Sequence, residues 1–132
     1  MKITREEDFA MIFMISLAEN YSKGFISLSN IADKNKLSPL FLKHIVSKLL
    51  KNGLIKSREG LYGGYKLAKS SGSISIAQIL KAISEDVIIP YCLHRNCRVR
   101  EKDCFCLPFW LKINRKIYSY LDNIKLSDLL QK

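Results

Sequence analysis

Residues 38–67, SPLFLKHIVSKLLKNGLIKSREGLYGGYKL, carry the pattern of one helix followed by two short strands. Ser38 followed by Pro39 predicts a helix start, because a serine hydroxyl caps the first turn and proline is tolerated at the first helical position. Apolar residues then recur at the i, i+3, i+4 spacing of one buried helix face. They are Leu42, Ile45, Val46, Leu49 and Leu50. Asn52 and Gly53 predict the end of this helix.

The second half of the stretch predicts a β-hairpin, which we call the wing (residues 54–67). Residues 54–58 and 65–67 have the composition of short strands. The connecting residues 59–64 contain three of the six glycines of the chain. A hairpin tip that presses its backbone against a phosphate ribbon needs residues without Cβ, often at positive φ. The glycines therefore favour a wing that touches nucleic acid.

Two helices are predicted upstream of this stretch. Thr4 and Glu7 have the spacing of a capping box and predict a helix over residues 5–19. Ser27 predicts the cap of a second, short helix. Its apolar residues are Leu28, Ile31 and Ala32. Because about four residues separate it from the helix at Pro39, the pair predicts a helix-turn-helix whose second helix is the recognition helix.

The pattern changes downstream of the wing. Residues 68–74 form a polar linker, and Ser75 predicts the start of another helix. Residues 86–109 show no periodicity, which is unusual in a compact domain unless something other than a core orders them. Pro108 predicts the start of a long last helix with an apolar seam of coiled-coil type. The seam residues are Trp110, Ile113, Ile117, Tyr120 and Ile124.

The predicted fold class is mainly α with a small β-hairpin wing, a winged helix-turn-helix with a long C-terminal dimerisation helix. The expected parts are a DNA-binding domain in residues 1–84, a cysteine-bearing loop in 85–109, and the dimerisation helix with a C-terminal segment in 110–132. The longest apolar run, residues 9–18, is too short for a transmembrane span.

That apolar run has two interpretations. It follows basic residues and ends on small ones, as a secretory signal does. However, Glu6, Glu7 and Asp8 place acids where a signal peptide carries positive charge, and the capping box predicts an ordinary helix. We therefore expect a cytoplasmic protein whose thiols stay reduced.

The charge of the chain is strongly positive. Its 132 residues include 22 Lys and Arg against 12 Asp and Glu, a formal net charge of +10. Residues 34–66 hold eight of the basic residues and one acid, Glu59. Such a surplus attracts polyanions, most commonly nucleic acid and less often a membrane surface or an acidic protein. The helix-turn-helix and wing therefore predict a DNA-binding surface.

Within this surface, lysines are expected to neutralise phosphates, while short polar groups such as Ser38 and His44 are better suited to base edges. Phe41 is equally suited to packing, and His44 equally to plain exposure. The candidate contacts are Ser38, Pro39, Leu40, Phe41, Lys43, His44, Lys48, Arg58, Gly60, Tyr62, Gly63, Gly64, Tyr65 and Lys66. The sequence contains no Ser/His/Asp set and no phosphate-cradling glycine motif, so we expect neither an enzyme nor a small-molecule substrate.

All four cysteines lie in one segment, with the spacing Cys92-x4-Cys97-x6-Cys104-x-Cys106. This is not the paired C-x2-C spacing of zinc ribbons. Soft thiolates wrapped around one point in a reducing compartment favour an iron–sulfur cluster. Zinc, or metal-free thiols that act as a redox switch, are the alternatives. Nearby arginines favour the thiolate form in each case.

Several features together resemble one family. They are the MKITREEDFA start, the helix-turn-helix, a wing ending in GGYKL (63–67), a loop with three cysteines, and a helix from Trp110 to NIKLSDL (123–129). In this order they resemble the Rrf-type winged-helix regulators, the bacterial family of the iron–sulfur regulator IscR, the nitric-oxide-sensing repressor NsrR and the iron regulator RirA. The resemblance covers essentially the whole chain.

The resemblance implies a homodimer with crossed C-terminal helices, recognition helices in successive major grooves and wings in the minor groove of double-stranded DNA. A 2Fe–2S or 4Fe–4S cluster near the dimer interface would be held by Cys92, Cys97 and Cys104. Asp8 matches the family position that supplies a fourth ligand from the other subunit. In the chain itself, Asp8 is also an ordinary acid in the first turn of a helix.

The chain departs from the family at two places. The histidine that follows the third cysteine in the cluster-regulator branch is missing, so Cys106 or Asp8 must replace it if a fourth protein ligand exists. The common wing pattern Ser-x-Arg-Gly is Ser57-Arg58-Glu59-Gly60 here, which displaces the arginine by one residue.

The sequence therefore predicts a cluster-sensing repressor that binds operator DNA as a dimer and does not act on membranes. Two alternatives stay open: a winged-helix regulator without a cluster, which senses thiol oxidation or a small molecule, and an adaptor that binds zinc or a cluster and docks an acidic protein.

Overall fold

α-Helices dominate the described chain, residues 2–84 and 104–130 of a computed structural model. The α-helices are α1 (Arg5–Glu19), α2 (Leu28–Asn35), α3 (Pro39–Lys51), α4 (Ile76–Ile83) and α5 (Cys106–Asp122). The strands are β1 (Ile55–Arg58) and β2 (Gly64–Leu67). Short 3-10 helices are η1 (Tyr21–Lys23), η2 (Ser71–Ser73) and η5 (Leu126–Leu130). The expected class, mainly α with a small hairpin, is confirmed.

Side-chain caps start the helices at the predicted places. The Glu7 amide donates to the Thr4 hydroxyl over 3.2 Å and the Thr4 amide donates to the Glu7 carboxylate over 2.8 Å, which completes the capping box of α1. Ser27 and Ser38 accept from amides in the first turns of α2 and α3. Pro39 is the first residue of α3. The helix-turn-helix is therefore encoded by local signals at its helix starts.

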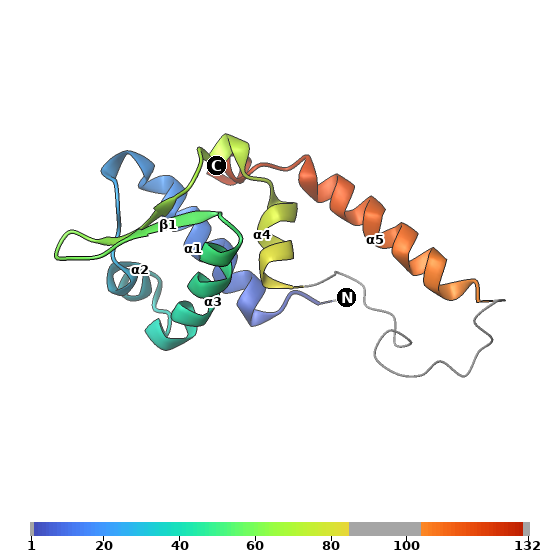
Figure 1. The fold of residues 1–132 in the computed structure, drawn as a ribbon, viewed down its shortest axis with the longest axis horizontal. Helices are drawn as coiled ribbons and strands as arrows, with labels where there is room; N and C mark the ends of the chain where they lie inside the picture. Colours follow the sequence, from blue (N-terminus) through green and yellow to red (C-terminus); the bar gives the residue numbers. More distant parts are fainter. Residues whose placement is uncertain (1, 85–103, 131–132) are drawn as a thin grey trace.

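The hydrophobic core lies between α1 and the helices and hairpin that surround it (Figure 1). From α1, Phe13, Met14 and Leu17 are buried, and they meet the predicted apolar face of α3. Leu50 is predicted on the buried face of α3 but is exposed. It follows Leu49 directly, and each residue is rotated by about 100° around the helix axis, which carries Leu50 off the buried face. The other predicted α3 face residues are buried: Leu42, Ile45, Val46 and Leu49. Burial of these side chains holds α3 against α1.

The wing is a two-stranded antiparallel sheet. Its register runs from Ile55 opposite Leu67 to Arg58 opposite Gly64. An isolated bridge pairs Tyr65 with Ile26, in the connection between α1 and α2, through two backbone hydrogen bonds of 2.8 and 2.9 Å. The hairpin is therefore tied to the helix-turn-helix and extends from it to the left edge of Figure 1.

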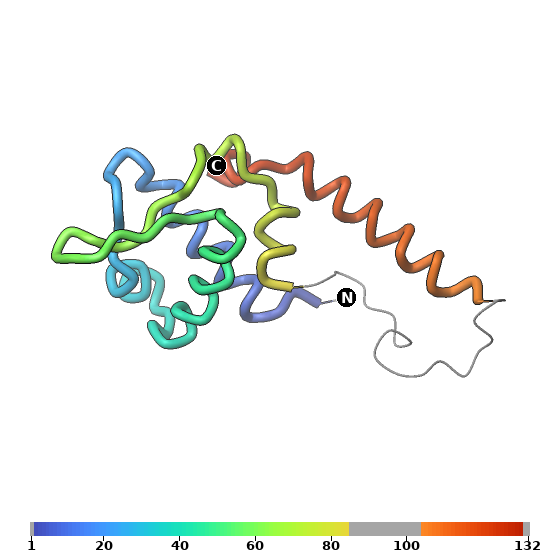
Figure 2. The backbone as a smooth tube through the Cα atoms, viewed as in Figure 1, coloured from blue at the N-terminus to red at the C-terminus, as the bar shows by residue number. Residues whose placement is uncertain are grey.

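The last part of the described chain is tied to α4. The Ile76 amide donates to the Ile124 carbonyl and the Leu126 amide donates to the Ile74 carbonyl. The predicted polar linker also contains Ile74, which is fully buried. From this attachment α5 extends away from the helix-turn-helix, as the tube in Figure 2 shows.

α5 begins at Cys106, two residues before the predicted start at Pro108. Proline is tolerated there because amides in the first helical turn have no partner within the helix. The short C-terminal segment is the 3-10 helix η5, which begins at Leu126. Among the described residues, no helix has both the length and the apolar character that a membrane crossing needs.

Candidate nucleic-acid interface

The outer face of α3 is open to solvent at its N-terminal half. Ser38, Pro39, Leu40, Lys43 and His44 are all exposed. Because a recognition helix presents mainly its N-terminal residues to the major groove, this exposure suits a base-reading surface. The face combines one lysine, one imidazole and one hydroxyl, which supply donors for phosphates and base edges.

Phe41, on the same turn, is engaged in packing. Its ring meets the Phe9 ring of α1 edge-on, with centroids 5.3 Å apart. The side chain is half-buried and packs against the core. Phe41 therefore contributes to the seating of α3 on α1.

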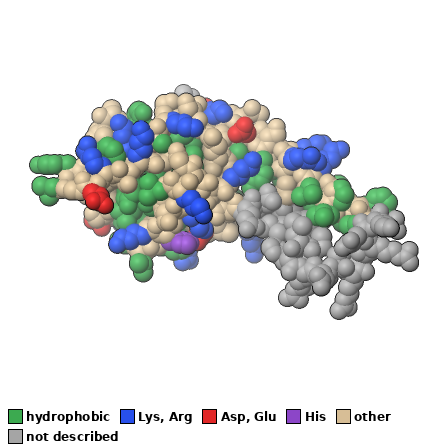
Figure 3. Space-filling model, viewed as in Figure 1, with side chains coloured by type: hydrophobic (Ala, Val, Ile, Leu, Met, Phe, Trp, Pro, Cys, Tyr) green, Lys and Arg blue, Asp and Glu red, His purple; other side chains and the backbone are tan. Residues whose placement is uncertain are grey.

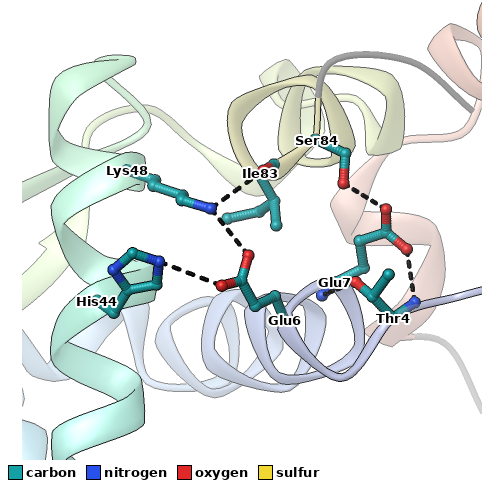
Figure 4. Close-up of polar contacts among 7 residues, drawn as sticks. All are labelled: Thr4, Glu6, Glu7, His44, Lys48, Ile83 and Ser84. Atoms are coloured by element: carbon teal, nitrogen blue, oxygen red, sulfur yellow. Dashed lines mark hydrogen bonds and ion pairs between the residues drawn. The ribbon is translucent and has the colours of Figure 1, made fainter. Parts of the chain in front are cut away.

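Two predicted DNA contacts of α3 are joined to Glu6 of α1 (Figure 4). His44 Nε2 lies 3.1 Å from Glu6 Oε1, and Lys48 Nζ lies 2.8 Å from Glu6 Oε2. Lys48 also donates to the carbonyl of Ile83, the last residue of α4, over 3.3 Å. The side chain of Lys48 is 32% exposed. The structure thus places Lys48 at the junction of α1, α3 and α4 rather than on the open face.

These contacts alter the acidity of Glu6. The hydrogen bond from Lys48 lowers the pKa of Glu6 below its usual value of 4.5, and the positive charge of Lys48 adds to this effect. The contact with His44 acts in the same direction, whereas partial burial opposes it. Glu6 is therefore held as a carboxylate that faces α3.

A second carboxylate on α1 binds the end of α4. Ser84, which follows the last residue of α4, donates its hydroxyl to Glu7. Glu7 also accepts from the Thr4 amide in the capping box. Figure 4 shows Glu6 and Glu7 side by side, one directed to α3 and the other to Ser84.

The tip of the wing presents two apolar side chains. Leu61 is 91% exposed and Tyr62 is 81% exposed. Figure 3 shows hydrophobic side chains at the left end of the molecule, where the wing lies. Gly60 has φ of 108°, which a residue with a side chain rarely adopts, and its carbonyl accepts from the Gly63 amide.

Arg58 is held along the wing. Its Nη2 donates to the Tyr62 carbonyl over 3.1 Å, and its guanidinium lies 4.4 Å from the centre of the Phe25 ring. Arg58, which stands one residue earlier than the arginine of the family's wing pattern, therefore makes its contacts within the protein itself.

Other predicted wing contacts have structural roles. At Gly63 an added Cβ would collide with the Arg58 carbonyl, and at Gly64 with the Ile26 carbonyl. Tyr65 packs against Phe13, with ring centroids 6.0 Å apart. Lys66 lies over the Tyr21 ring at 5.0 Å. The glycines thus permit a close approach of the wing to its own chain.

A groove of about 600 Å³ separates the wing from α1 and α2. Three basic side chains line it, Lys23, Lys34 and Arg58, together with Phe25 and Asn30. Figure 3 shows more Lys and Arg than Asp and Glu over the visible face of the body. The sequence pattern does not single out Lys23, Phe25 or Asn30, because only the path of the wing brings them beside Arg58.

The predicted cluster ligands are only partly within the described chain. Cys104, two residues before α5, is half-buried, and Cys106, the first residue of α5, is exposed. Asp8 is exposed in the first turn of α1. Cys92 and Cys97 lie outside the described residues. Within residues 2–84 and 104–130, no three His, Cys, Asp or Glu side chains gather closely enough for a metal ion. Figure 2 shows the start of α5 well apart from the start of α1.

The predicted seam of α5 lies beside its buried face. The buried residues of α5 are Asn114 and Tyr118, and Lys81 of α4 lies over the Tyr118 ring at 4.6 Å. Two seam residues are exposed, Trp110 and Tyr120. Ile113 and Ile117 are half-buried. Ile124 is half-buried too, but α5 ends at Asp122, so Ile124 lies beyond the helix and packs against the core.

Comparisons with known proteins match the chain almost from end to end. The Rrf2 family model, described as an iron-dependent transcriptional regulator, matches residues 3–132. The HTH-type transcriptional regulator IscR of Klebsiella pneumoniae is 30% identical over 98% of this chain and 80% of its own length.

Solved structures agree. CymR, the global cysteine regulator of B. subtilis, superimposes with a TM-score of 0.76 at 29% identity, over 98% of this chain and 95% of that one. The oxidised form of CymR from Staphylococcus aureus has a TM-score of 0.73 at 30% identity, over 100% and 98% of the two chains. These relatives are transcriptional regulators rather than enzymes, as expected. The capped helix-turn-helix, the wing and these matches lead to one conclusion: the chain belongs to the Rrf2 family of transcriptional regulators.

Proposed function

We propose that the protein is a dimeric repressor, acting on chromosomal DNA in the cytoplasm, whose operator affinity is controlled by an iron–sulfur cluster. The observation that carries this proposal is the separation of two chemistries along one chain. Residues 34–66 hold the basic helix-turn-helix and wing, whereas every cysteine lies between positions 92 and 106. The first segment suits a polyanion, and the second suits a thiophilic metal.

The DNA surface we propose combines the open face of α3 with the wing. Leu40, Lys43 and His44 would enter the major groove, with Ser38 and Pro39 at the helix start. The exposed tip residues of the wing, Gly60 to Tyr62, would lie along the minor groove. Lys23 and Lys34, in the groove beside the wing, are suitably placed to neutralise phosphates.

The second copy in the proposed dimer would pack along α5. Exposed apolar side chains concentrate on this helix: Phe109, Trp110, Leu111 and Tyr120. Soluble proteins seldom leave such a group uncovered, because its burial is favourable. The seam of Trp110, Ile113, Ile117, Tyr120 and Ile124 would supply the contact.

The cluster would be held by Cys92, Cys97 and Cys104, whose thiolates are the ligands that iron–sulfur clusters require. Cys106 and Asp8 are the candidates for a fourth ligand. Because the starts of α1 and α5 lie apart in one chain (Figure 2), Asp8 would have to come from the second subunit. When bound, the cluster would supply a centre that responds to iron supply, oxidation or nitric oxide.

Anaerobic purification tests the cluster. The expected result is a brown protein that contains iron and sulfide, with the colour lost in Cys92→Ala, Cys97→Ala and Cys104→Ala. Asp8→Asn and Cys106→Ala, made separately, identify the fourth ligand. A colourless protein with stoichiometric zinc would refute the cluster and favour the zinc-binding adaptor.

Titration of a labelled duplex from the protein's own promoter tests DNA binding. The logarithm of the binding constant should fall linearly with the logarithm of salt concentration, with a slope of about −0.9 for each phosphate neutralised. Binding that salt does not weaken, or binding to an acidic protein but not to the duplex, would refute the DNA surface.

A regulator without a cluster is the second candidate. Its support is the similarity to CymR, described as a cysteine regulator and also solved in an oxidised form, together with the exposed thiol of Cys106. If this candidate is correct, purified protein without iron should bind the promoter duplex and change its affinity after mild oxidation. Mass spectrometry of alkylated cysteines would then identify the thiols that react.

A further inference from the structure

Glu6 is the point at which α1 engages the recognition helix. Its two carboxylate oxygens are each used on α3, one by His44 at 3.1 Å and the other by Lys48 at 2.8 Å. We infer that Glu6 is a positioning residue that withholds Lys48 from DNA and orients His44, and so sets how many phosphates α3 neutralises. This inference rests on the DNA-binding function proposed above.

The position of Lys48 supports this inference. A lysine ammonium has three donors, and here one binds Glu6 while another binds the Ile83 carbonyl at the end of α4 (Figure 4). Both acceptors lie on elements other than α3, so the amine is directed into the junction of three helices. Lys43, on the same helix, is exposed instead.

The charges on α3 allow the expected change in the salt dependence of DNA binding to be calculated. Between Pro39 and Lys51 the helix carries Lys43, Lys48 and Lys51 and no acid. Glu6 neutralises one of these three charges from outside the helix. Release of Lys48 would add one cation for phosphate contact, which changes the salt slope by about 0.9 for each protomer bound.

The imidazole of His44 is oriented by the same carboxylate. Nε2 of His44 is directed to Glu6 Oε1, so the opposite edge of the ring, which carries Nδ1, is the one that can contact a DNA base. An oriented ring loses less conformational freedom when it meets a base edge than a freely rotating one. Loss of Glu6 should therefore reduce discrimination between sequences while it strengthens non-specific binding.

Salt titrations of fluorescence anisotropy test the inference. The probes are a mixed-sequence duplex of about three helical turns and the promoter duplex described above. The variants are Glu6→Gln, Lys48→Ala, Lys43→Ala and the double variant Glu6→Gln/Lys48→Ala. We expect a slope steeper by about 0.9 per protomer for Glu6→Gln, and one shallower by a similar amount for Lys43→Ala. Lys48→Ala and the double variant should keep the wild-type slope.

Glu7→Gln is the matched control. It removes the same charge from the same helical turn, and glutamine can still complete the capping box. Glu7 binds Thr4 and Ser84 rather than α3, so its slope should stay near that of the wild type. If Glu7→Gln steepens the slope as much as Glu6→Gln, the effect is one of general charge and the inference is wrong.

Other outcomes separate the two claims. A wild-type protein that shows no salt-dependent binding refutes the DNA-binding function and the inference with it. The wild type can also bind normally while Lys48→Ala makes the salt slope shallower by as much as Lys43→Ala does. That result would refute the inference but leave the DNA-binding function intact. Glu6→Asp, which retains the charge but shortens the side chain, replaces Glu6→Gln if the latter does not fold. The slope for Glu6→Asp should be steeper than that of the wild type, but by less than the change of about 0.9 per protomer expected when Lys48 is fully released from residue 6.

Discussion

Gly64 lies where the wing crosses the connection between α1 and α2. Its φ is 145°, and an added Cβ would collide with the Ile26 carbonyl. That carbonyl accepts the hydrogen bond from the Tyr65 amide which ties the wing to the helix-turn-helix. The local sequence explains a glycine in a turn, but only the packed structure explains why no larger residue fits here.

The first prediction compares two glycines of the wing. Gly60 also has a positive φ, of 108°, but an added Cβ meets nothing within 4 Å. Gly60→Ala should lower the free energy of unfolding by about 1 kcal/mol, from backbone strain alone. Gly64→Ala adds a collision with backbone and should cost about 3 kcal/mol or more. Urea unfolding measures both, and equal costs would contradict the close approach at Gly64.

The second prediction concerns the pH dependence of stability at Glu6. The lowered pKa of Glu6 in the folded state arises from Lys48 and His44 of α3. A carboxyl group whose pKa is lowered by folding stabilises the protein above its unfolded value of about 4.5, and this contribution is lost as pH falls through the folded value.

Wild type should therefore be more stable than Glu6→Gln at pH 7, and the difference should shrink as pH falls through the unfolded value of about 4.5 and below it. Urea midpoints of the two proteins across this range provide the measurement. A difference that does not vary with pH would contradict an ionised Glu6 at the junction. The contribution is modest because the side chain is 30% exposed.

At the scale of elements, the helices are well predicted because their signals are local. Each of Thr4, Ser27, Ser38 and Ser75 accepts from an amide three residues ahead. Capping-box spacing predicts the cap at Thr4, and a serine ahead of an apolar repeat predicts the other three. The errors occur where local signals are weak. α5 starts earlier than its proline suggests, and Ile74 is buried within a segment that looks polar.

The third prediction compares two helix caps. Ser38 is an exposed cap, whereas Ser75 is buried and also donates to Asp122 Oδ1 of α5 over 2.7 Å. Ser38→Ala should cost about 1 kcal/mol of stability. Ser75→Ala loses its cap and leaves Asp122 without that hydrogen bond, so we expect about 3 kcal/mol. Thermal or urea unfolding measures both costs, and equal costs would contradict the second role of Ser75.

At the scale of the whole molecule, the wing and α5 lie at opposite ends (Figure 1). In Figure 1 the helix-turn-helix and wing lie on one side of α4, and the start of α5 lies on the other. α4 lies between these two parts, and its end is bound by Glu7 and Lys48. The contacts of Glu6 and Lys48 therefore join α1, α3 and α4 at the middle of the molecule.

The fourth prediction concerns the proposed dimer. Trp110→Lys and Ile117→Lys should each shift the protein from dimer to monomer, because a charge in an apolar seam is costly to bury. Lys112→Ala, on the exposed side of the same helix, is the control and should leave the dimer intact. Sedimentation velocity over a range of concentrations measures the change. Dimers that persist in both seam variants would contradict an interface along α5.

The sequence alone determined the order of elements, the caps and the concentration of charge and sulfur in separate segments. These properties depend on residues a few positions apart, so local propensity and spacing encode them. Only the tertiary structure decided that Lys48 binds Glu6, 42 positions away, and that Glu7 binds Ser84, 77 positions away. Such contacts arise when burial of the core brings α1, α3 and α4 together, and no local pattern specifies which surface charges then meet.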